Sequence, residues 1–398
     1  MIIALKIVFW GSLAALVHTY LLYPIIMHFL ARGKSKSITI YNRKEELPKI
    51  IVLMAAYNEE KVLEEKIKSL LVQDYPKNKL HIYIGSDNST DSTDSIIKDF
   101  HQNHTNITFI PFKTRQGKTG IINRLVKEAS SIYPPEQDVI YLMTDASVML
   151  QSDVCYHLIK HFKNPQMAIV DAHMIYSGIS DNDISHSESS YLNAEVQLKN
   201  YESMVTQKMM GPFGGCYALR STYYEPVPSN RLVDDFYIAM TALKNNGLAI
   251  NSLDAKCYES VSHDMQSEYQ RKKRIGAGNF QNLFSFLTLM NPFTALGVSF
   301  ISHKVLRWKG PFFMICMLVS SYFLMVKGSE LFKWLFYGQL VWYLLPPLLL
   351  QVFSAIKVPI KIMRSITYFN LMNIALLHGF FQFIGGIKTG IWQPVERK

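Results

Sequence analysis

Two acidic sites, far apart in the sequence, contain the residues whose types are best suited to catalysis. Thr144 and Asp145 come directly after the apolar run 139–143, and the pair Asp234-Asp235 follows much later. A carboxylate at the end of a buried strand can bind a divalent cation, and a second carboxylate nearby can accept a proton from an attacking hydroxyl. Asp is also common in turns and at helix N-termini, which is the plainer interpretation of each. The chemical interpretation therefore requires elements that bring the two sites together.

The segment from Ile50 onward alternates between short apolar runs and amphipathic stretches. The pattern predicts strands at 50–56, 81–85, 108–111 and 139–143, and helices at 59–71, 91–100 and 118–129. Such alternation predicts an α/β fold with a mostly parallel central sheet covered by helices on both faces. Ligands of these sheets bind beyond the carboxyl ends of the strands, so the loops that follow the strands are the candidate site.

Polar residues follow three of these predicted strands. Asn58 and Glu59 come after the first strand, 86–91 after the second and Asp145 after the fourth. We expect the three clusters to converge on one crevice around a nucleotide. The alternative for the second cluster is an Asx-turn with Asp91 as the N-cap of the following helix, which is compatible with Asp87 contacting a ligand.

Lys118 follows Gly117 at the start of a predicted helix. The pair resembles the end of a phosphate-binding loop, but position 112 is Phe where an ATPase loop requires glycine. An ATPase is therefore excluded, although a helix N-terminus with Lys118 can still attract a phosphate.

Apolar residues make up 49% of the 398-residue chain and are unevenly distributed. The stretch 7–31 is long enough to span a bilayer and lacks a small-residue cleavage site, so residues 1–32 are predicted to be an N-terminal transmembrane anchor. Basic residues from Arg32 to Lys44 place the following domain in the cytoplasm. Further apolar stretches at 311–326, 331–354 and 366–387 predict a C-terminal transmembrane region, although the last carries polar residues and leaves open whether it spans, re-enters or lies flat.

The formal net charge is +10, and much of the excess lies beside the apolar stretches or in the run 271–274. Anionic lipids and a diphosphate explain this placement better than nucleic acid, so we expect membrane lipids as partners and no nucleic acid. The four cysteines form no CxxC pair, which favours a reducing compartment and argues against a zinc site.

Together these motifs resemble the membrane-bound family 2 inverting glycosyltransferases, which include cellulose, hyaluronan, chitin and poly-N-acetylglucosamine synthases. The matching pieces occur in the family's order: 56–60 (AYNEE), 73–76 (QDYP), 86–91 (SDNSTD), 115–118 (RQGK) with Asn123, 144–147 (TDAS), 214–220 (GGCYALR) and 234–236 (DDF). Each piece is weak alone, but the ordered series is specific. The resemblance runs from about Ile50 to the C-terminus and implies the GT-A fold.

The resemblance also implies a role for each candidate residue. Tyr57, Glu59, Asp87, Lys118 and Asp145 would bind a UDP-sugar, and Asp145 would hold Mg²⁺ or Mn²⁺ against its diphosphate. Asp235 aligns with the family's catalytic base, and Asp234 replaces a more usual Glu. The alternative for this acidic pair is helix capping without chemistry. Gly214 and Gly215 would lie beside the diphosphate and acceptor.

Two departures from the family pattern bear on function. The metal motif Asp-x-Asp ends in Ser147, which is a weak ligand, so water or another residue must complete the cation's shell. The Gln-x-x-Arg-Trp motif is matched by Gln270, Arg271 and Arg274 in either of two registers, neither of which supplies the tryptophan. The two arginines can still clamp phosphate, but processive synthesis is in doubt. The alternative for this basic run is contact with lipid headgroups.

The sequence thus predicts four parts: the anchor at 1–32, a cytoplasmic GT-A domain at 48–280, interfacial helices at 281–309, and a transmembrane region and tail at 310–398. The predicted enzyme is integral to the plasma or inner membrane. It transfers a hexose or N-acetylhexosamine from a UDP-sugar to a hydroxyl of a glycan or lipid-linked acceptor on the cytoplasmic face. One alternative is a processive polysaccharide synthase. Another is a non-catalytic nucleotide-binding membrane scaffold, which Ser147 favours.

Overall fold

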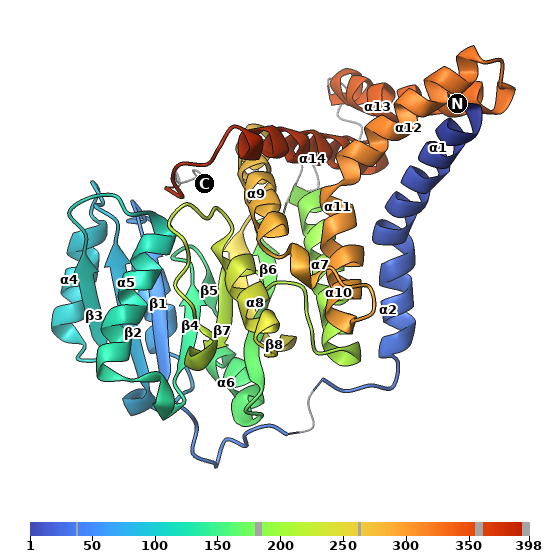
Figure 1. The fold of residues 1–398 in the computed structure, drawn as a ribbon. Coiled ribbons are helices and arrows are strands. Elements are labelled where there is room, and N and C mark those ends of the chain that lie inside the picture. The colour runs from blue at the N-terminus through green and yellow to red at the C-terminus, as the bar shows by residue number, and fades with distance from the viewer. Residues whose placement is uncertain (37–38, 180–184, 262–263, 355–360, 392–398) are drawn as a thin grey trace. The chain divides into compact units, whose positions relative to one another are not determined.

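The computed structural model describes residues 1–36, 39–179, 185–261, 264–354 and 361–391 (Figure 1). The chain divides into two compact units. The helical unit comprises Met1–Phe29, Ile179–Leu192 and Ser262–Gly386, and the sheet unit comprises Leu30–Gly178, Asn193–Val261 and Ile387–Lys398. The C-terminal tail from residue 392 and its side of the membrane lie outside the described residues.

The sheet unit is built on an eight-stranded sheet of order β3-β2-β1-β4-β7-β6-β8-β5. The strands are β1 (Ile50–Ala56), β2 (Leu80–Ser86), β3 (Ile107–Pro111), β4 (Ile140–Thr144), β5 (Met149–Leu150), β6 (Met167–Ser177), β7 (Cys216–Arg220) and β8 (Leu248–Ser260). The four strands predicted from the sequence are confirmed as β1 to β4. The apolar runs of β1 and β4 are continuous because this part of the sheet is covered on both faces.

The expectation of a mostly parallel sheet needs correction, because the sheet is mixed. β1, β2, β3 and β4 pair in parallel, as do β6 and β8, whereas β7 runs antiparallel to both of its neighbours and β5 antiparallel to β8. β7 reaches its place beside β4 only after the long excursion through β5, β6 and α7. Alternation of strands and helices indicates parallel pairing only where a crossover helix joins neighbouring strands, and that holds for the first half of the sheet alone.

The helices that accompany these strands are α3 (Leu63–Leu71), α4 (Thr93–Asn103), α5 (Gly117–Ile132), α6 (Val154–Ile159), α7 (Ser185–Val205) and α8 (Asp234–Lys244). The three helices predicted after the first three strands are confirmed, but α3 begins later than expected. Asn58 has a left-handed backbone (φ 53°), and the Glu59 N–H donates to Thr93 Oγ1 (2.8 Å). The residues after β1 are therefore held in a loop against the next loop of the sheet.

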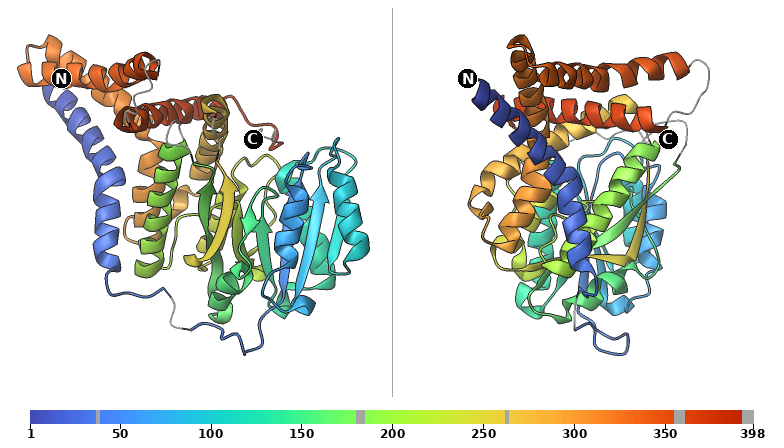
Figure 2. Two further views of the ribbon diagram at one scale, coloured as in Figure 1. Left: turned by 180° about the vertical axis from the view of Figure 1, so that it is seen from behind. Right: turned by 90° about the vertical axis from the view of Figure 1, so that its right-hand side faces the viewer.

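The helical unit contains α1 (Ile2–Val17), α2 (Tyr23–Ala31), α9 (Met265–Ser285), α10 (Ala295–Ser299), α11 (Leu306–Trp308), α12 (Gly310–Val326), α13 (Glu330–Ser354) and α14 (Lys361–Ile384). A π-helical turn, His18–Leu22, joins α1 to α2 so that they run on as one long helix (Figure 2). Phe9, Leu324 and Phe332 form an apolar cluster between α1, α12 and α13.

Among the described residues, one helix is long and apolar enough to cross a membrane, Ile2–Ala31. A second span is obtained only if Ala295–Trp308 and Gly310–Val326, which meet at a bend of 60°, are taken as one broken span. The predicted N-terminal anchor therefore has a matching helix. A separate C-terminal transmembrane helix is not shown, and the sides of the membrane stay a prediction.

Candidate active site

The parallel register brings the predicted strand ends to the same edge of the sheet. Ala56 at the end of β1 pairs with Ser86 at the end of β2, and Leu53 of β1 pairs with Met143 of β4. The residues that follow these strands, Asp87 and Asp145 among them, therefore emerge at one edge, as expected for parallel strands.

Asp87 is completely buried and forms a cradle with the start of α5. Its Oδ1 accepts from the Gln116 N–H (2.6 Å), and its Oδ2 accepts from the Gly117 N–H (3.1 Å) and from Arg115 Nε (2.9 Å). The Arg115 guanidinium lies 3.3 Å from the ring centroid of Tyr57. The carboxylate of Asp87 thus binds the α5 N-terminus, and the Tyr57–Arg115 stack beside it is half-buried.

Glu59 lies in the loop that is hydrogen-bonded to the loop after β2. Asn58 Oδ1 accepts from the Thr90 N–H (2.9 Å), and Asp91 accepts from the N–H groups of Glu60 (3.2 Å) and Thr93 (3.0 Å). Asp91 therefore binds backbone near the start of α4, which is the structural role considered for it above. These contacts fix the two loops that would surround the nucleotide.

Lys118 connects the α5 N-terminus to the end of β4, because its Nζ lies 2.6 Å from Asp145 Oδ1. Burial would lower the pKa of Lys118, but the carboxylates of Asp145, Asp234 and Asp235 outweigh it and raise the pKa above its usual value. One ammonium group is therefore influenced by all three carboxylates.

Asp234 and Asp235 form the first turn of α8. Burial and the neighbouring Asp234 raise the pKa of Asp235 to about 6, although Lys118 and the Phe236 N–H, which donates to Asp235 Oδ1 (2.8 Å), oppose the shift. A carboxyl of this kind is ionised at neutral pH and is still basic enough to accept a proton. The structure thus places the two predicted acidic sites within electrostatic reach of each other.

Gly214 and Gly215 pack closely between these two sites. A Cβ on Gly214 would lie 2.5 Å from Asp235 Oδ2, and one on Gly215 would lie 2.9 Å from Val148 Cγ2. The Gly215 carbonyl accepts from the Asp145 N–H (3.0 Å). The two glycines therefore allow the close approach of the turn 145–148, called the Asp145 turn below, and of the α8 N-terminus.

Ser147 replaces the second aspartate of the metal motif, and its Oγ donates to Glu259 Oε1 (3.2 Å) near the end of β8. Glu259 is 5% exposed. Together with Asp145, these residues offer hard oxygen donors of the kind that Mg²⁺ and Mn²⁺ accept. Within the described ranges, no group of three or more His, Cys, Asp and Glu side chains could hold a metal ion by itself. A cation here would therefore need oxygens from the donor diphosphate as well.

Lys66, on α3, was not identified from the sequence. Its side chain is fully buried under the Asp145 turn, where Nζ donates to Thr144 Oγ1 (2.7 Å) and to the Val148 carbonyl (2.5 Å). Burial lowers the pKa of Lys66 to about 8. In the sequence Lys66 belongs to an ordinary amphipathic pattern with Lys68, and Glu259 to an ordinary strand, so no local signal distinguishes either.

Gln270, Arg271 and Arg274 belong to α9 of the helical unit. Arg271 forms ion pairs with Glu188 and with Glu268, the latter with Nε 2.7 Å from Oε2. Carboxylates of its own unit thus bind the guanidinium that was predicted to clamp phosphate. The diphosphate role of these three residues stays a prediction.

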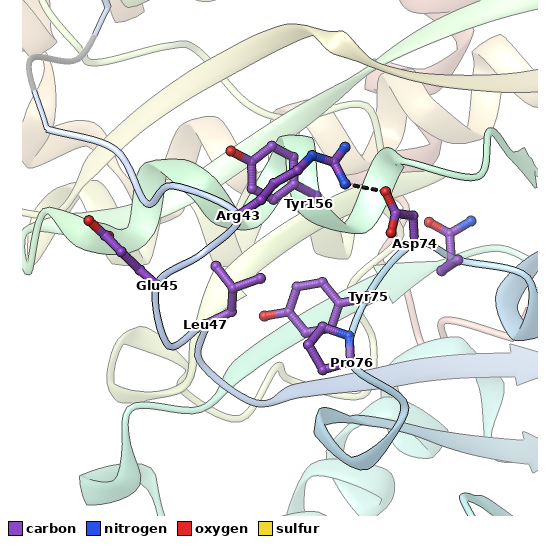
Figure 3. Close-up of a pocket in the computed structure, with 8 residues that line it drawn as sticks. Arg43, Glu45, Leu47, Asp74, Tyr75, Pro76 and Tyr156 are labelled. Atoms are coloured by element: carbon purple, nitrogen blue, oxygen red, sulfur yellow. Dashed lines mark hydrogen bonds and ion pairs between the residues drawn. The ribbon is translucent and has the colours of Figure 1, made fainter.

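A separate cavity of about 430 Å³ lies beside the motif residues 73–76 (Figure 3). Tyr75 Oη donates to the Pro48 carbonyl (2.5 Å), just before β1 begins, so this cavity lies at the amino end of that strand. Arg43 pairs with Asp74 and stacks on Tyr156 across it (Figure 3). The motif therefore supports the start of the sheet and not the candidate site.

Comparison with known proteins agrees with this geometry. Residues 51–227 match the family model described as glycosyl transferase family 2. The chain contains a family 2 glycosyltransferase domain. Poly-β-1,6-N-acetyl-D-glucosamine synthase from Staphylococcus epidermidis is 29% identical over 163 residues, which are 38% of this chain and 37% of the synthase. β-Monoglucosyldiacylglycerol synthase from Nostoc is 26% identical over 185 residues, 45% of this chain and 37% of that enzyme.

Likeness to solved structures supports the fold of this family 2 domain. Mannosyltransferase PcManGT from Pyrobaculum calidifontis, solved with GDP-Man and Mn²⁺, superposes with a TM-score of 0.67 at 17% identity, covering 96% of this chain and 97% of its own. The predicted GT-A fold is confirmed at this level. The alignments span little more than a third of the curated relatives above, so their activities are not transferred to the whole chain.

Proposed function

We propose that the protein is a membrane-anchored inverting glycosyltransferase. It would move a hexose or N-acetylhexosamine from a UDP-sugar to a hydroxyl of a glycan or lipid-linked acceptor on the cytoplasmic face. The observation that carries the proposal is the placement of Asp235. It lies in the first turn of α8 beside a second carboxylate, packs against Gly214, and like Asp145 interacts electrostatically with Lys118.

Asp235 is the proposed base. At neutral pH its carboxylate is ionised and accepts the proton of the acceptor hydroxyl as that oxygen attacks the anomeric carbon. The bond from the anomeric carbon to the diphosphate oxygen breaks, UDP leaves with the electron pair, and attack from the opposite face inverts the configuration. Asp234 keeps Asp235 basic by its charge.

The leaving diphosphate requires positive charge. Lys118 supplies a fixed ammonium near the α5 N-terminus. Asp145, Ser147 and Glu259 would hold Mg²⁺ or Mn²⁺, which when bound would offset the charge that develops on the diphosphate. In this proposal Glu259 takes the part of the missing second aspartate.

Several observations support the remaining parts of the proposal. The two relatives are named as synthases of an N-acetylglucosamine polymer and of a glucosyl lipid, which suits a UDP-hexose or UDP-N-acetylhexosamine donor. The helix Ile2–Ala31 suits an anchor, and the basic residues after it favour a cytoplasmic domain.

The first experiment measures UDP release by the full chain in membranes or detergent. UDP-glucose, UDP-N-acetylglucosamine, UDP-galactose and UDP-glucuronate are compared with Mn²⁺, Mg²⁺ and EDTA. We expect one donor to give cation-dependent release and transfer.

Asp235→Asn is expected to reduce transfer by at least about a thousandfold while UDP affinity stays within a few-fold, because the amide keeps the shape but cannot accept the proton. Glu65→Gln, an exposed carboxylate on α3, is the matched control and should behave as wild type. Turnover retained by Asp235→Asn would remove the assignment of the base. Binding of UDP without turnover by the wild-type chain would instead favour the non-catalytic scaffold.

A further inference from the structure

The proposed chemistry gives no role to Asp171 on β6, a fully buried carboxylate of the sheet unit. Its Oδ2 lies 2.6 Å from Lys199 Nζ and accepts from Asn251 Nδ2 (3.2 Å), and its Oδ1 accepts from the Phe213 N–H (2.8 Å). Lys199, on α7, is 3% exposed. Two opposite charges are thus removed from water in the interior of the domain.

Such a pair is not explained by stability. Removing two charges from water costs several kcal/mol per ion, and apolar side chains of similar volume are often as stabilising. Burial raises the pKa of Asp171 even against the opposing charge of Lys199 and the hydrogen bonds it accepts. An apolar pair could reproduce neither the hydrogen bond from Asn251 nor the one from the Phe213 N–H, and the latter reaches the segment beside the candidate site.

Phe213 begins a segment of three residues that contacts both halves of the candidate site. The next residue, Gly214, packs against Asp235 so tightly that a Cβ would lie 2.5 Å from its Oδ2. The carbonyl of Gly215 accepts from the Asp145 N–H (3.0 Å) and from Thr144 Oγ1 (3.1 Å). Backbone contacts of the segment 213–215 therefore set the spacing between the proposed base and the proposed cation ligand.

We propose that Asp171, held by Lys199, is a positioning residue that fixes the segment 213–215 and thereby the placement of Asp235 relative to Asp145. The inference rests on the proposed function, since it assigns Asp171 to the same site. Asp171 touches neither donor nor acceptor in this proposal. It acts through the Phe213 amide.

Two double variants separate this role from mere stability. Asp171→Asn/Lys199→Met removes both charges but keeps a side-chain oxygen for the Phe213 N–H. The Asn251 amide can adapt, because its Oδ1 has no hydrogen-bond partner among the residues that the structure describes. Asp171→Val/Lys199→Met removes the same charges and also the acceptor. The two variants therefore differ in the polar side chain that accepts from the Phe213 N–H and bonds to Asn251.

Each protein is assayed for UDP-binding stoichiometry, for kcat per UDP-binding site, and for hydrogen exchange of the peptide 210–216. For the Val/Met variant we expect kcat per site to fall at least about tenfold, UDP affinity to stay within about threefold, and exchange of the peptide to accelerate. The Asn/Met variant should stay within about threefold of wild type in all three measurements.

A purely structural role predicts another result. The Val/Met protein would then contain fewer UDP-binding molecules, but each would turn over at the wild-type rate with unchanged exchange, and this outcome overturns the inference. If the Val/Met protein binds no UDP, the variant Asp171→Glu tests the inference instead. Its side chain keeps the ion pair with Lys199 but is longer by one methylene, so it displaces the segment 213–215. A kcat per site within about threefold of wild type for that variant also overturns the inference. A wild-type chain without turnover would reject the proposed function instead, while accelerated exchange in the Val/Met protein would still support the anchoring of 213–215.

Discussion

Asp235 shows how one carboxyl group acquires its chemistry from its neighbours. The sequence identifies the residue only through a family motif, whereas the structure gives the cause of its basicity: burial and the adjacent Asp234. Lys118 limits the shift, so the group still ionises below neutral pH.

This balance predicts the pH dependence of transfer. The base acts when deprotonated, so kcat should rise with pH through a midpoint near 6. Asp234→Asn removes a charge that raises the pKa of Asp235, and the midpoint should move to lower pH. Glu65→Gln should leave it unchanged. Rate profiles between pH 4.5 and 8 measure the midpoint, and an Asp234→Asn profile displaced to higher pH would contradict this electrostatic account.

At the scale of elements, the loop before β7 packs tightly against the first turn of α8. Gly214→Ala would place a methyl group 2.5 Å from Asp235 Oδ2. The carboxylate must move, so kcat should fall by about a hundredfold while UDP affinity is nearly unchanged. Gly328→Ala, at an open position beyond α12, is a control for expression and purification only, because its positive φ adds strain of its own. Equal kcat for Gly214→Ala and wild type would contradict this prediction, because it would show that the Asp235 carboxylate can move without loss of activity.

The approach of β8 to the Asp145 turn predicts how the cation is bound. Glu259→Gln should weaken the affinity for Mn²⁺, measured by calorimetry in the presence of UDP, by about tenfold or more. Ser147→Asp restores a second carboxylate beside Asp145, so the double variant Ser147→Asp/Glu259→Gln should recover most of that affinity. If Glu259→Gln binds Mn²⁺ as well as wild type, the carboxylate of β8 has no part in the cation's shell.

At the scale of the whole molecule, the chain returns to the sheet unit after the segments of the helical unit. Ile387–Lys398 belongs to the sheet unit, where the Gly390 N–H donates to the Ser229 carbonyl (3.2 Å) and Gly390 lies against Gly117. Gly117 in turn donates to Asp87. The last described residues thus pack beside the cradle of the predicted nucleotide site.

Truncation after Gly386 should therefore lower Tm by several degrees and weaken UDP binding, because it uncovers the 229–231 loop and the α5 N-terminus. Truncation after Ile391 keeps every described contact of this segment and is the matched control. Thermal unfolding with and without UDP measures both effects. An unchanged Tm and UDP affinity in the shorter protein would mean that these contacts contribute nothing to the site.

The sequence by itself determined what is encoded locally or in ordered motifs. Continuous apolar runs specify β1 to β4, helical spacing specifies α3 to α5, and the motif series specifies the family 2 domain and the expectation that Asp87, Asp145 and Asp235 act at one site. Such features depend on residues close together in the chain, so their periodicity is visible without coordinates.

Only the tertiary structure decided which distant groups meet. The antiparallel insertion of β7, the buried Lys66 under the Asp145 turn, the contact of Ser147 with Glu259 and the Asp171–Lys199 pair all join residues with large sequence separations. The ion pairs of Arg271 with Glu188 and Glu268 could likewise not be predicted from the motif. Buried polar groups must be paired because they lose their hydration, and which groups become buried depends on the packed arrangement. The local sequence around a lysine or glutamate does not show whether it will be one of them.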